Sequence, residues 1–353
     1  MKKYILRFTD ETEYHAGMKA TDDVEKIASE CGYKKFYVPI KVSEHRIRNN
    51  IKKAFTFSKL LKIEKNSTII IQHPVHTTST YITVLKKLKK IKNWKYIFVI
   101  HDLETLRRIF LNEIEKYELI DNTMYDIADA IIAHNEKMMD YLVNEAGVKR
   151  EKLINLRLFD YLLPENIKAD NDNITKNDGV IIAGNLDKTK CTYAYKLAEL
   201  KSDTRFELYG VNWSLEGKHG DNWNYHGAFP PDELISHMRG AFGLVWDGQQ
   251  LDTCTGATGK YVRYNNPHKV SLYIAAAIPV IIWKEAALAD FITKNNIGIA
   301  ISNLKDIDSE IAGISDEHYA QMLSNIKKLS DKVRNGGFTT EALKEAERVV
   351  DNR

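Results

Sequence analysis

Short apolar runs rich in β-branched residues alternate with amphipathic stretches along the whole chain of 353 residues. This alternation is typical of βαβα units, in which a parallel sheet carries helices on both faces. Helical patterns lie between the runs, for example at 22–31 and 135–146. The sequence therefore predicts an α/β protein with two doubly wound sheets. The runs that predict strands fall at 4–8, 36–40, 68–72, 96–100 and 130–134, and again at 180–183, 205–209, 242–246, 280–283 and 298–301.

A polar, Asn/Asp-rich segment separates the two series of runs and predicts a linker at 166–178. A chain of this length fits two domains, which we place at 1–165 and 179–335. A separate C-terminal helix is predicted within 336–353, and it could cross back to the first domain. Two Rossmann-like domains that face each other would place a ligand cleft at the carboxyl ends of their strands.

The most apolar stretch, residues 268–283, is too short for a membrane span and contains Pro279. A bilayer-crossing helix needs about 20 unbroken apolar residues. We therefore expect a buried helix that ends at Ala277, followed by a buried strand. Three cysteines match no zinc or CxxC spacing, and reduced thiols fit a cytoplasmic protein without a transmembrane segment.

The run from Lys86 to Lys95 contains six lysines, although the net charge of the chain is only +3. Apolar residues recur in it at helical spacing, so a solvated helix face is the simplest interpretation. The alternative is a surface that meets anionic lipid headgroups, with the protein peripheral on the inner face of the membrane. No RNA-binding motif accompanies the lysines, so we expect no nucleic-acid partner.

The turn after the strand at 180–183 contains Gly184, Asn185 and Lys188. A small turn at a glycine exposes backbone N–H groups to a ligand, and a lysine beside it can meet a phosphate. An ordinary strand–helix turn explains the same residues equally well.

A Gly/Thr-rich loop follows the strand at 242–246, and Tyr264 and Asn266 lie just beyond it. A long loop at a strand end is either a binding loop or disordered. Aromatic, hydroxyl and amide groups at this density favour recognition of a polyhydroxylated ligand.

The helix predicted after Pro267 places Lys269 where backbone N–H groups also point outward. A cation at a helix N-terminus opposes the helix dipole unless an anion binds there. The sequence therefore predicts an anion beside Lys269.

A second helix is predicted to begin at Ala286, Ala287 and Leu288, directly after the strand at 280–283. Small residues at a helix start let a diphosphate approach the backbone N–H groups. Asp290 follows about one turn later, where its carboxylate could accept ribose hydroxyls. The alternative for Asp290 is a first-turn acid that complements the helix dipole.

The order Lys269-x3-Tyr273-x-Ala-Ala-Ala-x-Pro279, followed by Ala286-Ala287-x2-Asp290, resembles the donor-site signature of GT-B glycosyltransferases. In that signature the lysine holds the diphosphate of a nucleotide sugar, two small residues start a helix, and the acid binds the ribose. Many retaining members carry a Glu three residues after the lysine, where this chain has Leu272, which leaves inversion open.

Two further segments resemble the bacterial β-1,6-galactofuranosyltransferase branch of that fold, to which the streptococcal adhesin glucosyltransferases are related. They are Phe242-Gly-Leu-Val-Trp-Asp-Gly248 and Tyr264-Asn-Asn-Pro-His-Lys269. The resemblance implies that residues 179–335 bind the nucleotide sugar and that 1–165 face the acceptor. It adds donor contacts from Trp246, Asp247, Tyr264 and Asn266.

Inversion requires a base on the acceptor side. The strand at 96–100 delivers His101 and Asp102 to the predicted cleft, and we expect Asp102 to be the base, with His101 or His73 orienting it or touching the donor. The alternative is that His101 and Asp102 simply cap the next helix. Other acceptor-side candidates at the strand ends and in the loop before the first helix are Asp10, His15, Gly17, Lys19, His76 and Glu104.

The resemblance implies transfer of a sugar, expected to be galactofuranose from its UDP conjugate, to a glycan or a lipid-linked saccharide with inversion. Asp170-Asn171-Asp172 matches the metal-binding DxD of GT-A enzymes, but it falls in the linker, so no metal or other cofactor is expected. The alternatives are a UDP-glucose-dependent glucosyltransferase acting on a glycoprotein and a non-catalytic partner-binding module. A homo-oligomer is compatible with either.

Overall fold

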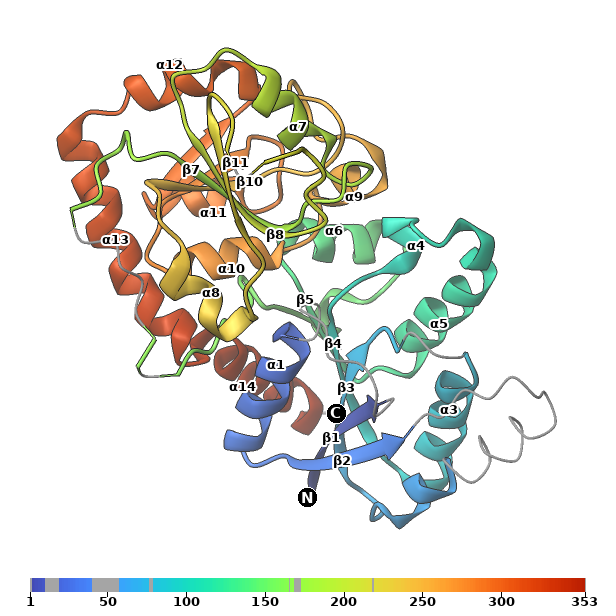
Figure 1. Cartoon of the computed structure of the whole chain (residues 1–353). Coiled ribbons are helices and arrows are strands. Elements are labelled where there is room, and N and C mark those ends of the chain that lie inside the picture. Colours follow the sequence, from blue (N-terminus) through green and yellow to red (C-terminus); the bar gives the residue numbers. More distant parts are fainter. Residues whose placement is uncertain are drawn as a thin grey trace. The chain divides into compact units, whose positions relative to one another are not determined.

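The computed structural model describes residues 2–9, 19–39, 57–75, 79–164, 166–167, 173–217 and 219–352. The chain divides into two compact units (Figure 1). The first unit comprises Met1–Arg157 and Phe338–Arg353, and the second comprises Leu158–Gly337. The C-terminal helix α14 (Gly337–Asp351) thus groups with the first unit, as a helix that crosses back would do.

The first unit contains a six-stranded parallel sheet with the order β2-β1-β3-β4-β5-β6. Strand β3 is buried at all of its positions, which its apolar Ile-Ile-Ile centre allows because helices cover both faces of such a sheet. The five strands predicted in this part of the sequence are confirmed, and the short β6 was missed. The strands are β1 (Lys3–Thr9), β2 (Lys34–Pro39), β3 (Thr68–His73), β4 (Lys95–Ile100), β5 (Ala130–Ala133) and β6 (Leu153–Asn155).

Helices follow the strands of the first unit in the predicted alternation. They are α1 (Lys19–Glu30), α3 (Thr80–Lys92), α4 (Glu104–Arg107), α5 (Ile114–Ile127) and α6 (Glu136–Asn144), with 3₁₀ turns η2 (Lys59–Lys62), η3 (Leu111–Glu113) and η4 (Arg150–Lys152).

The second unit contains another six-stranded parallel sheet, with the order β12-β11-β10-β7-β8-β9. All five strands predicted here are confirmed, and β9 was missed. The strands are β7 (Val180–Asn185), β8 (Phe206–Val211), β9 (Trp223–Gly227), β10 (Phe242–Val245), β11 (Val280–Trp283) and β12 (Gly298–Ile301). The helices are α7 (Thr192–Glu199), α8 (Pro231–His237), α9 (Gly256–Tyr261), α10 (His268–Ala275), α11 (Ala289–Lys294), α12 (Ile307–Ala312) and α13 (Asp316–Arg334), with η5 at Leu304–Asp306.

The apolar stretch at 268–283 forms the buried helix α10 and the buried strand β11. The helix ends two residues before the predicted Ala277, which adopts a positive φ of 55° and turns the chain toward the strand. Helix α10 packs very closely on the sheet, since a Cβ at Gly243 would lie 2.2 Å from the ring of Tyr273. None of the described helices is both long and apolar enough to cross a membrane.

Each sheet reverses its direction of growth at one place. In the first sheet this topological switch point lies between β1 and β3, and in the second it lies between β7 and β10. Ligands of open α/β sheets bind outside the carboxyl ends of the strands at such switch points. The ends of these four strands are therefore where candidate residues are expected.

Candidate functional site

The switch point of the second unit brings together Gly184, Asp247 and Lys269. Gly184 is the last but one residue of β7, not part of the turn after it, and has a φ of 133°. A Cβ there would lie 3.3 Å from Cε of Lys269. Asp247 follows β10, and its Oδ1 lies 3.7 Å from Nζ of Lys269, which stands at the start of α10. The cation therefore lies at the crevice between β7 and β10, and its contact with a diphosphate stays a prediction.

The pairing of Lys269 with Asp247 is loose. Its 3.7 Å separation exceeds a normal hydrogen bond, and the side chains retain 23% and 18% of their exposure. Lys269 also belongs to the first turn of α10, where helix N–H groups favour an anion. An incoming anion could bind this lysine without first breaking a strong ion pair.

Asn185 and Lys188 shape the turn that follows β7. The side-chain oxygen of Asn185 accepts hydrogen bonds from Asp187 N and Asn212 Nδ2, both at 3.0 Å. Lys188 is exposed, and its Nζ lies 5.5 Å from the ring centroid of Tyr195. Within the described part of the chain no measured contact joins Lys188 to Lys269, so a shared phosphate stays a prediction.

Trp246 and the loop after it are tightly folded. The Trp246 side chain is fully buried, and its indole N–H donates to Gln250 O at 3.0 Å. A Cβ at Gly248 would lie 2.4 Å from Thr255 O, and one at Gly259 would lie 2.9 Å from Asp247 O, so these glycines compact the loop. Trp246 is part of the core in this structure, and a donor contact from it stays a prediction.

Tyr264 is partly exposed and Asn266 is buried, with 4% of its surface accessible. Both residues lie between α9 and α10, in the segment that leads to Lys269. Their donor contacts also stay predictions.

The helix predicted to begin at Ala286 begins at Ala289 instead. Ala286 N donates to Trp283 O and Ala287 N donates to Val262 O, both at 3.0 Å. These bonds hold the two alanines and Leu288 in a turn before α11. The predicted helix start is therefore wrong, because carbonyl groups within the fold already bind the N–H groups of Ala286 and Ala287.

Asp290 lies in the first turn of α11. This position fits both a ribose-binding acid and an acid that only complements the helix dipole. Its side chain is 83% exposed and accepts a hydrogen bond from Lys294 Nζ at 3.2 Å. A ribose contact from Asp290 stays a prediction.

In the first unit, Asp102 and Glu104 share the guanidinium of Arg107 just after β4. Arg107 Nη1 donates to Asp102 Oδ2 at 2.6 Å, while Nη2 and Nε donate to the two oxygens of Glu104 at 2.6 and 3.2 Å. Leu103, rather than His101 or Asp102, is the N-cap of α4. The capping alternative for these two residues is therefore not what the structure shows.

His73 ends β3 at the switch point and is completely buried. Its Nε2 lies 2.7 Å from Asp121 Oδ1, and Asp121 Oδ2 accepts a hydrogen bond from Thr105 Oγ1 at 2.6 Å. His101 Nε2 lies 2.8 Å from Gln72 Oε1. Asp121 and Arg107 were missed from the sequence; an acid on the buried face of a helix was the available signal for Asp121.

Burial shifts two proton affinities in this region. It raises the pKa of Glu104 to about 7, with the charge of Asp102 adding to the rise and Arg107 opposing it. Burial lowers the pKa of His134, which follows β5, to about 4. His134 is therefore neutral at pH 7, whereas Glu104 changes its charge near that pH.

The remaining acceptor-side candidates are placed less informatively. Lys19 begins α1, and its Nζ donates to Asp23 Oδ1 at 2.7 Å, one helical turn away. Among the described residues, no group of three or more His, Cys, Asp or Glu side chains is arranged to hold a metal ion. Asp10, His15, Gly17, His76 and the DxD motif at 170–172 lie outside the described residues.

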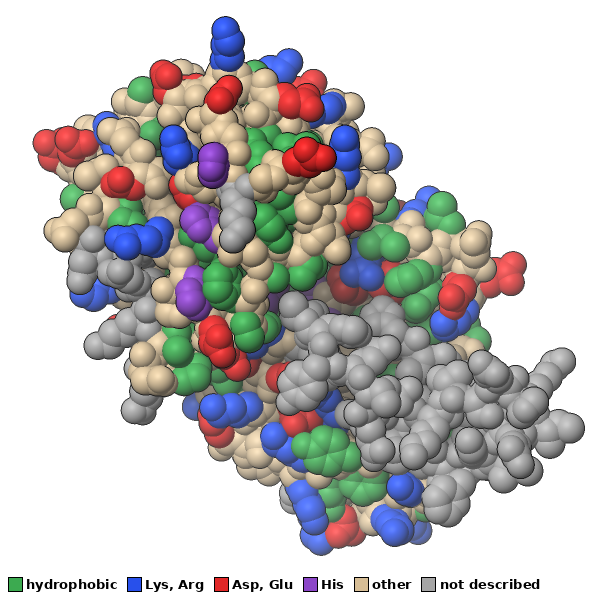
Figure 2. All heavy atoms as spheres, viewed as in Figure 1, with side chains coloured by type: hydrophobic (Ala, Val, Ile, Leu, Met, Phe, Trp, Pro, Cys, Tyr) green, Lys and Arg blue, Asp and Glu red, His purple; other side chains and the backbone are tan. Residues whose placement is uncertain are grey.

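Several lysines between Lys86 and Lys95 are used within the fold. Lys86 pairs with Asp126, Lys89 binds Asp129, and Lys92 Nζ donates to the carbonyl oxygens of Leu61 and Ile63 at 2.6 and 3.0 Å. On the face of the second unit that Figure 2 shows, basic and acidic side chains are interspersed. Contact of the lysine run with a membrane stays a prediction.

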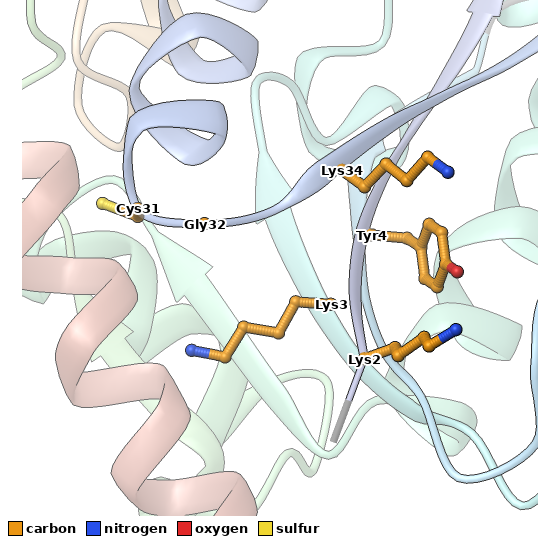
Figure 3. A pocket seen from close by; sticks show the side chains of 6 residues that line it. All are labelled: Lys2, Lys3, Tyr4, Cys31, Gly32 and Lys34. Carbon is orange, nitrogen blue, oxygen red and sulfur yellow. The ribbon is translucent and has the colours of Figure 1, made fainter.

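A hollow of about 420 Å³ lies at the amino-terminal ends of β1 and β2, and its lining includes Lys2, Lys3 and Lys34 (Figure 3). Lys3 points toward α14 and binds Glu347, whereas Lys2 and Lys34 point the other way, and Lys2 binds Glu64. These lysines do not converge on one ligand, and they lie at the opposite end of the strands from the switch point.

Comparisons with known proteins cover nearly the whole chain. The family models of the glucosyltransferase 3-like N-terminal and C-terminal domains match residues 2–158 and 180–346. The chain is 32% identical to the β-1,6-galactofuranosyltransferase WbbI of Escherichia coli K12, over 99% of this chain and 98% of that protein. It is 24% identical to glucosyltransferase 3 of Streptococcus gordonii, over 98% of both chains.

Two solved structures share the fold at low sequence identity. The lipopolysaccharide outer core galactosyltransferase WaaB in its apo form aligns with a TM-score of 0.63 and 10% identity, over 99% of both chains. A glycosyltransferase from Rickettsia africae aligns with a TM-score of 0.59 and 11% identity, over the full length of both chains. The two-unit α/β architecture is thus the GT-B fold.

Proposed function

This chain belongs to the glucosyltransferase 3-like family of GT-B glycosyltransferases, and we propose that it transfers galactofuranose from UDP-galactofuranose to a glycan or a lipid-linked saccharide. The galactofuranosyl specificity is supported by the 32% identity to WbbI, whose name states a β-1,6-galactofuranosyl transfer. The assignment of the donor site is supported by one observation: Lys269 is only loosely paired and lies beside Gly184 at the β7/β10 switch point.

The donor diphosphate would bind at Lys269, with Lys188 as the second cation. Both lysines lie at the carboxyl edge of the second sheet, where an anionic ligand of an open α/β sheet is expected. Two cations and helix N–H groups would neutralise the diphosphate without a metal ion. Asp290 would accept hydrogen bonds from the ribose, and the turn at 286–288 would lie against the nucleotide.

The reaction would be a direct displacement. The acceptor hydroxyl oxygen attacks the anomeric carbon while the bond from that carbon to the diphosphate oxygen breaks, and UDP leaves with the electron pair. Attack opposite to the leaving group inverts the anomeric configuration. The hydroxyl proton passes to Asp102, which is the base in this proposal and is partly exposed after β4.

Turnover of UDP-galactofuranose, measured with and without EDTA against a panel of oligosaccharide and lipid-linked acceptors, tests the proposal. We expect transfer that is unaffected by EDTA and a product of inverted configuration. No sugar transfer to any acceptor would exclude the galactofuranosyl assignment, and strong inhibition by EDTA would exclude metal independence.

A glucosyltransferase that acts on a glycoprotein is the second candidate, because the family model and the streptococcal relative carry the name of glucosyltransferase 3. Competition between UDP-glucose and UDP-galactofuranose in the same assay separates the two donors. A non-catalytic partner-binding module is the third candidate. Absence of UDP binding by calorimetry, together with absence of turnover, would favour it.

A further inference from the structure

We propose that Arg107 is a positioning residue for Asp102 and that the buried Glu104 anchors it. The inference rests on the proposed function, in which Asp102 takes the acceptor proton. It assigns to Arg107 two effects on this base: a fixed orientation of the carboxylate and a lowered affinity for the proton.

The guanidinium of Arg107 makes unequal contacts with the two carboxylates. It holds both oxygens of Glu104 through Nη2 and Nε, and one oxygen of Asp102 through Nη1. The Glu104 side chain is 0% exposed, whereas Arg107 and Asp102 retain 20% and 24% of their exposure. The three groups thus form a chain. Glu104 is the buried anchor, Arg107 is the cation in the middle, and Asp102 is a partly exposed carboxylate that solvent can reach.

Two-point binding explains why Glu104 serves as the anchor. A bidentate pair between arginine and a carboxylate fixes the plane of the guanidinium. With this plane fixed, the third donor, Nη1, has a defined direction toward Asp102. Contact with one oxygen of Asp102 then orients the other oxygen of the same carboxylate.

Helix α4 has only four residues, which is too short to be stable by itself. Leu103 precedes it with a fully buried side chain, and its carbonyl accepts a hydrogen bond from Arg107 N at 2.8 Å. Thr105 ties the helix to α5, because its hydroxyl and N–H both donate to Asp121. This support holds the backbone of Arg107 in place.

The charges around the cluster determine the direction of each effect. Asp102, Glu104 and Asp121 are the nearby carboxylates, Arg107 is their cation, and His73 and Tyr117 face the cluster from β3 and α5. Removing the positive charge of Arg107 makes protonation of Asp102 easier. Burial raises the pKa of Glu104 to about 7, so E104Q removes little negative charge from the surroundings of Asp102 at acid pH.

The test compares R107A, R107K and E104Q with R108A, which removes an exposed arginine at the next position. Transfer is measured against pH with saturating UDP-sugar, and UDP affinity is measured by calorimetry. We expect R107A to lower kcat about 100-fold, because a displaced base loses most of its contribution, with partial recovery in R107K. UDP affinity should be unchanged in all four variants.

The direction of the pH shift distinguishes positioning from a purely structural role. The acid limb of the kcat profile should move to higher pH in R107A, by about one unit. It should stay in place in E104Q, because burial raises the pKa of Glu104 to about 7 and its carboxyl is already neutral on the acid side of that pH. A structural role would lower activity in both variants without moving the limb. Wild-type-like kcat and an unmoved limb in R107A, matching R108A, would overturn the inference.

A measurement that needs no turnover separates this inference from the proposed function. The ¹³C signal of the Asp102 carboxyl, assigned by its loss in D102N, is titrated in the wild type, R107A and R108A. A titration midpoint that rises in R107A and stays in place in R108A supports the role of Arg107 even if the sugar assignment fails. A midpoint unchanged in R107A would refute the role even if the enzyme transfers galactofuranose.

Discussion

The charged groups at the β7/β10 switch point and those that follow β4 differ in how firmly they are held. At the β7/β10 edge, Lys269 lies 3.7 Å from Asp247, beside a glycine that leaves space for its side chain. After β4, Arg107 binds Asp102 and Glu104 at 2.6 Å, and Glu104 is buried. A loosely held cation is suited to exchange its partner for an anion, whereas a tightly held carboxylate is suited to take a proton at a fixed place.

The largest expected effect follows from replacing Lys269. K269A should weaken UDP binding by about 10- to 150-fold, because a hydrogen bond to a charged group contributes about 1.5–3 kcal/mol. Calorimetry with UDP measures the change. K294A, which removes an exposed lysine on α11, is the matched control and should change UDP affinity less than twofold if Asp290 and not Lys294 contacts the nucleotide. Equal affinity of K269A and the wild type would mean that the loose ion pair is only structural.

The sequence revealed the second unit's switch point better than the network after β4. Gly184, Asp247 and Lys269 each follow a strand or begin a helix, so strand assignment alone brings them together. Arg107 lies on the four-residue helix α4 and Asp121 on α5, and their partners depend on tertiary contacts that no local pattern encodes.

The fold was predictable where strands are central and buried. The missed strands β6 and β9 are both at the edge of a sheet, where pairing on one side suffices and a long β-branched run is not required. The misplaced start of α11 has a different cause. Alanines favour helices, but Ala286 and Ala287 donate their N–H groups to Trp283 and Val262 instead.

The tightly held network should also show in the pH dependence of stability. Burial raises the pKa of folded Glu104 from 4.5 to about 7. Since the folded value lies above the unfolded one, neutral Glu104 stabilises the fold fully below pH 4.5, and this contribution is lost as the pH rises through 7. Urea unfolding should show that E104Q gains about 2–3 kcal/mol relative to the wild type between pH 4.5 and pH 8. A constant difference between the two proteins would show that Glu104 does not titrate in this range.

The space beside the loosely held lysine depends on Gly184. G184A forces a side chain onto a φ of 133° and places its Cβ 3.3 Å from Lys269 Cε. We expect a loss of about 1–2 kcal/mol in unfolding free energy and UDP binding weakened severalfold. The control is G147A, at a φ of 66° with no atom within 4 Å of the new Cβ, which should cost stability without changing UDP affinity. Identical UDP affinities of G184A and G147A would argue against a diphosphate next to Gly184.

The smallest expected effect on stability belongs to Asp290. Its exposed pair with Lys294 spans one helical turn, and such pairs contribute about 0.3–0.5 kcal/mol. D290N should therefore have an unfolding free energy within about 0.5 kcal/mol of that of the wild type.

The affinity of D290N for UDP should nevertheless fall, while its affinity for an analogue without the ribose hydroxyls should not. Calorimetry of both ligands with D290N and with the wild type shows whether Asp290 contacts the ribose or only complements the helix dipole. Equal losses for both ligands, or no loss for either, would leave Asp290 as a first-turn acid that complements the dipole of α11. The nucleotide would then depend on the edge formed by Gly184 and Lys269 alone.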